Sequence, residues 1–115
     1  MIVDISAVNP VMFAKAIADE TRQRIMRACC CEWVSVGALV EQIGLKQPTV
    51  SHHLAILREA GLVGIRHEGK QTFYMLNQSR VVSCCGQLMT AFAPEEKATA
   101  VINEMAPSPS VPSIR

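Results

Sequence analysis

The sequence predicts a mainly α-helical domain with one small β-hairpin, because helical patterning is interrupted at only one place. Apolar residues recur at helical spacing from about residue 10 to residue 60. Residues 63–76 are instead β-prone, and a turn-forming His-Glu-Gly-Lys stretch divides them into two runs. Helical spacing returns after Asn77. The length of 115 residues, half of them hydrophobic, fits a single core.

Capping residues locate the first two helices. Asn9-Pro10 reads as an N-cap followed by proline at the first helical position, and Asp19 can cap a second helix that runs to Cys30. The apolar residues that we expect to face inward are Phe13, Ala14, Ile17 and Ala18 in the first helix and Ile25, Met26 and Ala28 in the second.

The next two helices predict a helix-turn-helix. Ser35 can cap a third helix that ends at Gly44, and a fourth helix runs from about Pro48, in its first turn, to Ala60. A short turn joins the two. The inward residues of the third helix are Leu39, Val40 and Ile43. Because a hairpin follows, the whole unit is predicted to be a winged helix-turn-helix.

A further helix should follow Asn77, with apolar residues at Val81, Val82, Cys85, Leu88, Met89 and Phe92. Another short helix is expected from Pro94. Residues 106–115 are rich in proline and serine, which is typical of a disordered tail. The predicted organisation is therefore one domain over residues 1–105 and a tail over 106–115.

Short polar side chains crowd the start of the fourth helix, where a DNA-reading helix meets base edges. We expect Gln47, Thr49, Ser51 and His52 to contact bases or nearby phosphates. The expected backbone contacts are Lys46, Arg58, Arg66, His67 and Lys70. A merely solvated helix face is the alternative. The basic, glycine-containing hairpin tip favours DNA, although the net charge of +1 gives no global argument.

Five cysteines occur in two groups, Cys29 to Cys31 and Cys84 with Cys85. An odd number in tight groups favours soft-metal or redox chemistry over structural disulfides. Neighbouring cysteines should not bond to each other, because their Cα atoms lie about 3.8 Å apart, below the usual disulfide range. Trivalent arsenic takes three thiolates, so we expect Cys84 and Cys85 to bind arsenite with Cys30 or Cys29. The alternative is that the cysteines only pack.

The segments "ADETRQRIM", "SVGALVEQIGLKQPTVSHHLAILREAGLV" and "GKQTFYML" resemble the ArsR-SmtB family of bacterial winged-helix repressors over about residues 10–92. The resemblance implies a homodimer on operator DNA that is released by an inducer, usually a thiophilic or transition metal. It also implies pairing of the first helix with the helix after the wing. The expected interface residues are Phe13, Ile17, Val81, Val82, Leu88, Met89 and Phe92.

Two family inducer sites are missing from this sequence. Ser35 and Gly37 stand where one branch carries a Cys-x-Cys pair, and residues 79–92 contain no Asp, His or Glu for a zinc site. A third branch senses oxidants or persulfides through one cysteine in the second helix and one after the wing. The alternative to arsenite is therefore a redox or persulfide switch that links these two helices.

Other function classes fit the sequence less well. There is no nucleophile–base arrangement and no phosphate-binding glycine loop, so an enzyme is not expected. The chain has neither a secretory signal nor a membrane-spanning run, which predicts a cytoplasmic protein. A metal-buffering or interaction module that lacks specific DNA binding is the remaining alternative.

Overall fold

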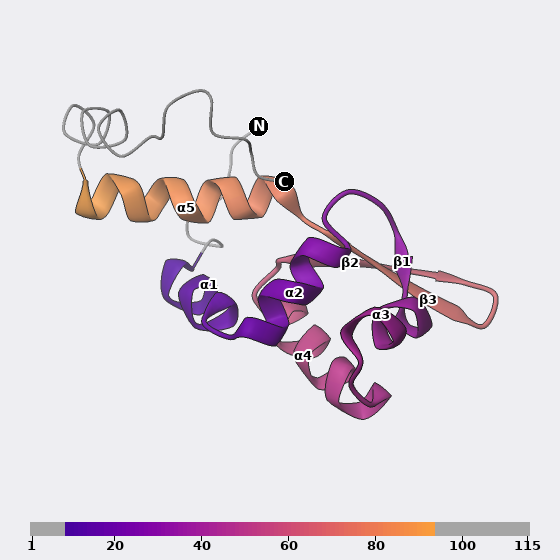
Figure 1. The fold of residues 1–115 in the computed structure, drawn as a ribbon. Coiled ribbons are helices and arrows are strands. Elements are labelled where there is room, and N and C mark those ends of the chain that lie inside the picture. Colours follow the sequence, from indigo (N-terminus) through magenta and orange to yellow (C-terminus); the bar gives the residue numbers. More distant parts are fainter. Residues whose placement is uncertain (1–8, 94–115) are drawn as a thin grey trace, which may run out of the picture.

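The computed structural model describes residues 9–93. In chain order, these residues form α1 (Pro10–Ile17), α2 (Glu20–Ala28), β1 (Val34–Ser35), α3 (Val36–Ile43), α4 (Gln47–Glu59), β2 (Val63–Glu68), β3 (Gln71–Leu76) and α5 (Gln78–Phe92). Figure 1 shows α5 lying along α1 on one side of the molecule, while the β2–β3 hairpin projects from the other side beyond α3. The predicted helix from Pro94 and the tail lie outside the described residues.

The predicted caps of the first two helices are confirmed. Asn9 Oδ1 accepts hydrogen bonds from the backbone N–H groups of Val11 and Met12, both at 3.0 Å, and Asp19 Oδ1 accepts one from Arg22 N–H at 2.9 Å. The apolar stripe predicted for α1 is partly wrong. Besides Phe13 it buries Ala16, whereas Ala14 and Ala18 are exposed. The cause is that α1 has only eight residues and ends at Ile17, so one narrow face meets the core.

Helix α2 ends earlier than predicted. Its last residue is Ala28, and Cys29 is the C-cap with φ of −115° and ψ of 25°. The predicted continuation to Cys30 is therefore wrong, because the chain leaves the helix in order to bring β1 to the sheet. Cys30 and Cys31 consequently lie in an irregular loop between α2 and β1.

The helix-turn-helix forms as predicted. Gly44 ends α3 in the left-handed conformation, with φ of +81°, which glycine adopts without steric cost. After α4, Gly61 has φ of +74°, and a Cβ there would lie 3.1 Å from the guanidinium of Arg80 in α5. A side chain at position 61 would therefore have to displace Arg80.

The sheet has three strands rather than the two that were predicted. Its order is β1-β3-β2, with both pairs antiparallel, and Val34 pairs with Tyr74 while Ser35 pairs with Phe73. The predicted hairpin is confirmed, since Val63 pairs with Leu76 and Glu68 with Gln71. Strand β1 escaped prediction because two residues cannot show an alternating pattern. We refer to the β2–β3 hairpin as the wing.

The predicted interface residues separate into two groups. Phe13 is only 2% exposed and belongs to the core, while Ile17, Val81 and Leu88 pack partly buried against it. The expectation that Phe13 lies at the dimer interface is wrong, because its side chain packs inside the core of the single chain. Three residues of α5 are uncovered: Val82 at 69%, Met89 at 43% and Phe92 at 81% exposure. Val11 and Met12 of α1 are also exposed.

Within residues 9–93, no helix combines the length and apolar character that crossing a membrane requires.

Candidate nucleic-acid interface and thiol cluster

Helix α4 presents its polar side chains outward because its opposite face is anchored in the core. Val50, Leu54 and Leu57 are fully buried. The four predicted base-contacting residues, Gln47, Thr49, Ser51 and His52, are all exposed. Lys46 is the N-cap of α4 and makes no capping bond with its side chain. The start of α4 therefore offers free polar groups, a cation and the positive end of the helix dipole.

The tip of the wing lies next to the start of α4. Gln47 and Lys70 line one cavity of about 240 Å³, together with residues at the start of α3. The sequence predicted both residues as DNA contacts but not the polar residues beside them in this cavity, Ser35, Gln71 and Thr72. Ser35 was predicted to cap α3 and to stand where one branch of the family carries a cysteine, and its Oγ does accept from Ala38 N–H at 3.1 Å. Gln71 and Thr72 lie in a stretch whose sequence is typical of a β-strand and contains no motif that indicates a binding site.

The other side chains predicted to contact the DNA backbone do not line this cavity. His67 Nδ1 lies 3.2 Å from Thr72 Oγ1 across the wing. The guanidinium of Arg66 lies 3.2 Å from Glu68 Oε2 and 4.8 Å from the centre of the Trp33 ring. Arg58 is in the last turn of α4, roughly 16 Å along the helix axis from Gln47. The structure thus brings Gln47 and Lys70 together but not Arg58.

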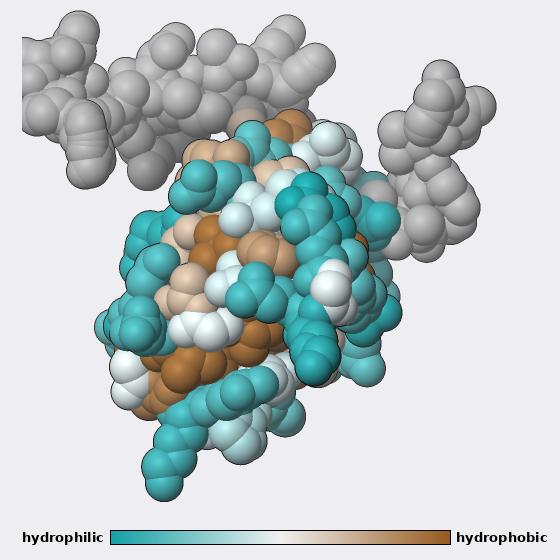
Figure 2. All heavy atoms as spheres, turned by 90° about the vertical axis from the view of Figure 1, so that its right-hand side faces the viewer, coloured by the Kyte–Doolittle hydropathy of each residue, from teal (hydrophilic) through white to brown (hydrophobic). Residues whose placement is uncertain are grey.

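Figure 2 looks onto the end of the molecule that carries the wing. Hydrophilic side chains project around the rim of this face, and hydrophobic side chains show between them. Long polar side chains on a protruding surface suit contacts with a phosphate backbone.

Two of the five cysteines belong to the hydrophobic core. Cys29 and Cys84 are buried, and the Cys29 carbonyl accepts from Leu76 N–H at 2.8 Å. Burial raises the pKa of the Cys29 thiol to about 11. Burial also raises the pKa of Cys84, and its neighbour Cys85 adds to that rise while Arg80 opposes it. Both thiols therefore stay protonated at neutral pH and are poor nucleophiles.

The raised pKa of Cys29 predicts a loss of stability at alkaline pH. The unfolded thiol ionises near its ordinary value of 9.0, so the unfolded state loses this proton first as pH rises. Between about pH 9 and pH 11 the free energy of unfolding should therefore fall by roughly 2–3 kcal/mol from this group alone. Urea unfolding across that range should show a shallower decline in Cys29→Ala. Parallel declines in the two proteins would contradict the assignment.

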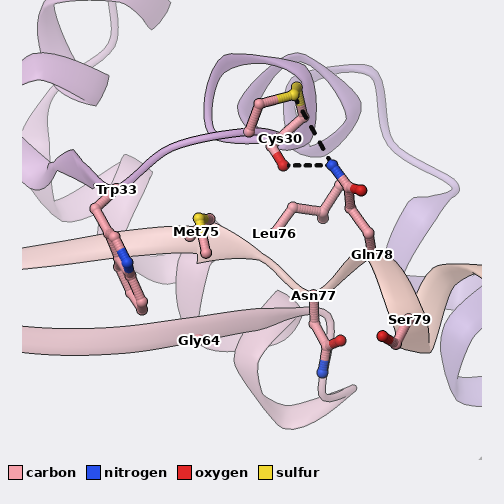
Figure 3. Close-up of a pocket in the computed structure, with 9 residues that line it drawn as sticks. Cys30, Trp33, Gly64, Met75, Leu76, Asn77, Gln78 and Ser79 are labelled. Atoms are coloured by element: carbon pink, nitrogen blue, oxygen red, sulfur yellow. Dashed lines mark hydrogen bonds between the residues drawn. A yellow bond between two sulfur atoms is a disulfide. The ribbon is translucent and has the colours of Figure 1, made fainter.

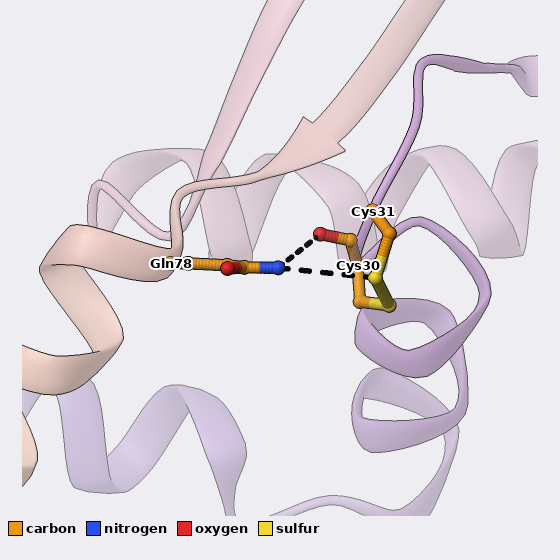
Figure 4. The surroundings of a disulfide bond; sticks show 3 residues. All are labelled: Cys30, Cys31 and Gln78. Atoms are coloured by element: carbon orange, nitrogen blue, oxygen red, sulfur yellow. Dashed lines mark hydrogen bonds between the residues drawn. A yellow bond between two sulfur atoms is a disulfide. The ribbon is translucent and has the colours of Figure 1, made fainter.

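Cys30 and Cys31 are joined by a disulfide, contrary to the prediction that neighbouring cysteines do not pair. Their Cα atoms are 3.8 Å apart, as expected, but the loop after α2 lets the two side chains converge, which a regular helix would not. Figure 4 shows Gln78, in the first turn of α5, pointing its amide at this loop. Its Nε2 donates to the Cys30 carbonyl at 2.8 Å and lies 3.8 Å from Cys31 Sγ.

Cys30 borders two cavities. One is an open recess of about 510 Å³ between the disulfide, Trp33 and the start of α5, and Figure 3 shows Gln78 reaching across it to Cys30. The other, of about 350 Å³, lies between α1, α2 and α5 and is lined by both Cys30 and Cys85. The structure therefore brings one cysteine from each group to a shared cavity. Cys85, unlike Cys84, is exposed.

The predicted convergence of three thiolates is not seen in residues 9–93, where no three Cys, His, Asp or Glu side chains are grouped so as to hold a metal ion. Of the predicted set, Cys29 and Cys84 pack in the core, and Cys30 and Cys85 share the cavity.

Comparison with known proteins identifies transcriptional regulators among the relatives of this chain. Residues 19–64 match the family model described as "Bacterial regulatory protein, arsR family". The biofilm growth-associated repressor of Xylella fastidiosa is 44% identical over 63 residues, which are 55% of each chain. The transcriptional activator HlyU of Vibrio cholerae is 37% identical over 76 residues, covering 66% of this chain and 70% of HlyU. The match spans little more than half of the Xylella repressor.

Solved structures agree with this fold. The structure of reduced HlyU from Vibrio cholerae has a TM-score of 0.58 and 32% identity, covering 74% of this chain and 88% of HlyU. An ArsR-like transcriptional regulator from Rhodococcus sp. RHA1 has a TM-score of 0.70 over 92% of this chain and 99% of its own. At 23% identity, the latter likeness concerns the fold alone. Both likenesses support the fold described above.

Proposed function

We propose that this chain, which belongs to the arsR family of bacterial regulatory proteins, binds operator DNA as a homodimer and represses transcription there. This is a family of transcriptional regulators rather than of enzymes. The observation that carries the proposal is the exposed polar start of α4 next to the wing tip, where Gln47 and Lys70 meet. In a winged helix-turn-helix, these two elements approach the major groove and the adjacent backbone. Repression requires access to chromosomal DNA, so the site of action is the cytoplasm.

Substitutions can distinguish the residues proposed to contact bases from the residue proposed to contact phosphate. Gln47→Ala or His52→Ala should weaken operator binding by about 1–3 kcal/mol and relax the base preference, because each removes a contact to a base edge. Lys70→Ala should weaken all duplexes alike and flatten the salt dependence, because it removes a phosphate contact. Fluorescence anisotropy with operator and scrambled duplexes at several salt concentrations measures both effects. Unchanged operator affinity in both base-contact variants would refute the proposed reading helix.

A metal-buffering or interaction module would behave differently in the same experiment. Such a protein would bind no duplex in preference to another, and its affinity would not fall steeply with salt. The wild-type salt titration therefore separates the two function classes before any variant is made.

The proposed dimer uses the apolar stripe of α5, which we define as Val82, Met89 and Phe92. These residues follow one another at intervals of seven and three, so they lie on one face of the helix. All three are exposed in the single chain. A second copy of α5, together with the exposed start of α1, can cover them.

The proposed effector acts on cysteine sulfur, and the shared cavity favours the sulfur atoms of Cys30 and Cys85. Cys85 is exposed and lines the same cavity as Cys30. Its thiolate can attack Cys30 Sγ, so that the Cys30–Cys31 bond breaks, a Cys30–Cys85 bond forms and Cys31 leaves as a thiolate. This exchange only moves a disulfide that already exists. When the cysteines are reduced, the effector is an external disulfide or polysulfide, which accepts the two electrons as the protein disulfide forms. The new bond would tie the loop after α2 to the dimer helix α5.

The exchange would also reach α5 through Gln78. Its amide contacts both Cys30 and Cys31, so a change in the loop alters two contacts of the first turn of α5. We therefore favour a redox or persulfide switch. Arsenite is the second candidate, because reduced Cys30 and Cys31 with Cys85 would supply the three thiolates that trivalent arsenic takes. It is placed second because the loop would have to rearrange to bring the three together.

A further inference from the structure

The side chain of Arg22 connects three helices at one point. From α2, its Nε donates to the Ala16 carbonyl and its Nη2 donates to the Lys15 carbonyl at 3.3 Å, both in α1. Its Nη1 lies 3.1 Å from Nδ1 of His53 in α4 and 4.0 Å from a carboxylate oxygen of Asp19. The side chain is only 13% exposed. Neither the proposed DNA contacts nor the thiol cluster accounts for this arrangement.

Two side chains of α2 close the C-terminal end of α1, where backbone carbonyls lack helical partners. Arg22 donates hydrogen bonds to the carbonyls of Lys15 and Ala16, and Gln23 Nε2 donates to the Ile17 carbonyl at 2.7 Å. Only Arg22 also reaches α4. The planar guanidinium can do so because its donors point in several fixed directions.

The contact with α4 is made by His53. Arginine is only a donor, so His53 Nδ1 is the acceptor in this contact. His53 is half-buried, whereas its neighbour His52, a proposed base contact, is exposed. The two rings have centroids 5.8 Å apart. Holding His53 therefore adds a polar restraint to the rotation of α4, whose apolar face is anchored in the core, and so to the direction in which His52 points.

We infer that Arg22 is a positioning residue that fixes the angle between the reading helix α4 and helix α1, and thereby the spacing of operator half-sites that the dimer accepts. The inference rests on the proposed function. Val11 and Met12, at the other end of α1, are exposed, and α1 packs against α5, which carries the proposed dimer stripe, so α1 relates each reading helix to the dimer axis. A dimer that reads two half-sites about one helical turn apart discriminates spacing only if that relation is rigid.

The test uses full-length protein and an inverted-repeat duplex that the wild type selects from a random library, with spacers lengthened or shortened by about two base pairs. We expect the wild type to prefer the selected spacing by roughly tenfold or more, and His53→Ala to reduce the preference to about twofold. His53→Asn should restore it, because Asn Oδ1 can accept from Arg22 in a similar place. Gln23→Ala is the matched control, since it loosens the same end of α1 without touching α4.

Thermal melting of each variant separates positioning from stability. Gln23→Ala should lower the melting temperature yet keep the spacing preference, because a ratio of affinities depends only on folded protein. The inference is overturned if His53→Ala keeps the wild-type preference, or if Gln23→Ala loses it equally. A wild type that selects no duplex would instead overturn the proposed function, and this inference with it.

Discussion

A charge placed in the apolar stripe of α5 is expected to convert the dimer into a monomer and to abolish specific operator binding. Phe92 is 81% exposed and Val82 is 69% exposed in the single chain, so Phe92→Asp and Val82→Asp should leave its fold intact. In the dimer, the same carboxylate would be buried without a partner, at a cost of several kcal/mol. A monomer contacts one half-site only. Its operator affinity should therefore fall by roughly 100-fold or more.

Sedimentation and binding to the selected duplex measure the two effects separately. Thr90→Asp is the matched control, because Thr90 is exposed on the same helix but lies roughly 80° around its axis from Val82. That variant should stay dimeric and bind the operator. If Phe92→Asp and Val82→Asp both remain folded dimers, the dimer does not use this stripe and the proposed interface is wrong.

The helical part of this fold is predictable because its signals are local. Asn9, Asp19 and Ser35 each accept a backbone N–H in the first turn of their helix, and Gly44 ends α3 as its position implies. Each signal depends on a few adjacent residues. The reading face of α4 was predictable for the same reason, since burial of one side of the helix determines which residues face outward.

Features that depend on long-range packing were not predictable. Strand β1 forms by pairing with β3, whose paired residues lie 38 and 40 positions further along the chain. The early end of α2 follows from that strand, and the convergence of Cys30 and Cys31 follows from the early end. The burial of Cys29 and Cys84 likewise depends on how α2, β3 and α5 meet. The sequence therefore indicated thiol chemistry but not which sulfur atoms are accessible.

The thiol switch is expected to require Cys85 and not Cys84, although the two are adjacent. Cys85 is exposed and lines the cavity that Cys30 also lines, whereas Cys84 is buried and the pKa of its thiol is raised. Reduced wild-type protein treated with an organic disulfide should form a Cys30–Cys85 bond, each disulfide accepting two electrons and leaving as two thiols. Cys85→Ser should bind the operator as well as the wild type but stay bound after this treatment. Cys84→Ala should respond like the wild type.

The size of the response follows from where the bond would act. The loop that holds Cys30 continues from α2, which packs against α3 and α4, and Cys85 lies in α5, the helix that carries the proposed dimer stripe. A bond between Cys30 and Cys85 would change the orientation of each reading helix α4 relative to the dimer axis. Coupling between such sites typically amounts to about 1–3 kcal/mol, so the wild-type affinity should fall by roughly 5- to 150-fold.

Titration of the DNA complex with three reagents separates the candidate effectors. Release by an organic disulfide or a polysulfide, with a crosslinked peptide joining Cys30 and Cys85 in mass spectra, supports the redox switch. Release by arsenite alone, under reducing conditions and dependent on Cys31 as well as Cys85, would replace it with arsenic sensing, because only three-thiolate binding needs Cys31 in the final complex. A complex that survives all three reagents would show that these cysteines only pack. The Cys31→Ser variant separates the redox switch from arsenic sensing. A Cys30–Cys85 disulfide can still form without the Cys31 thiol, whereas the three-thiolate site cannot.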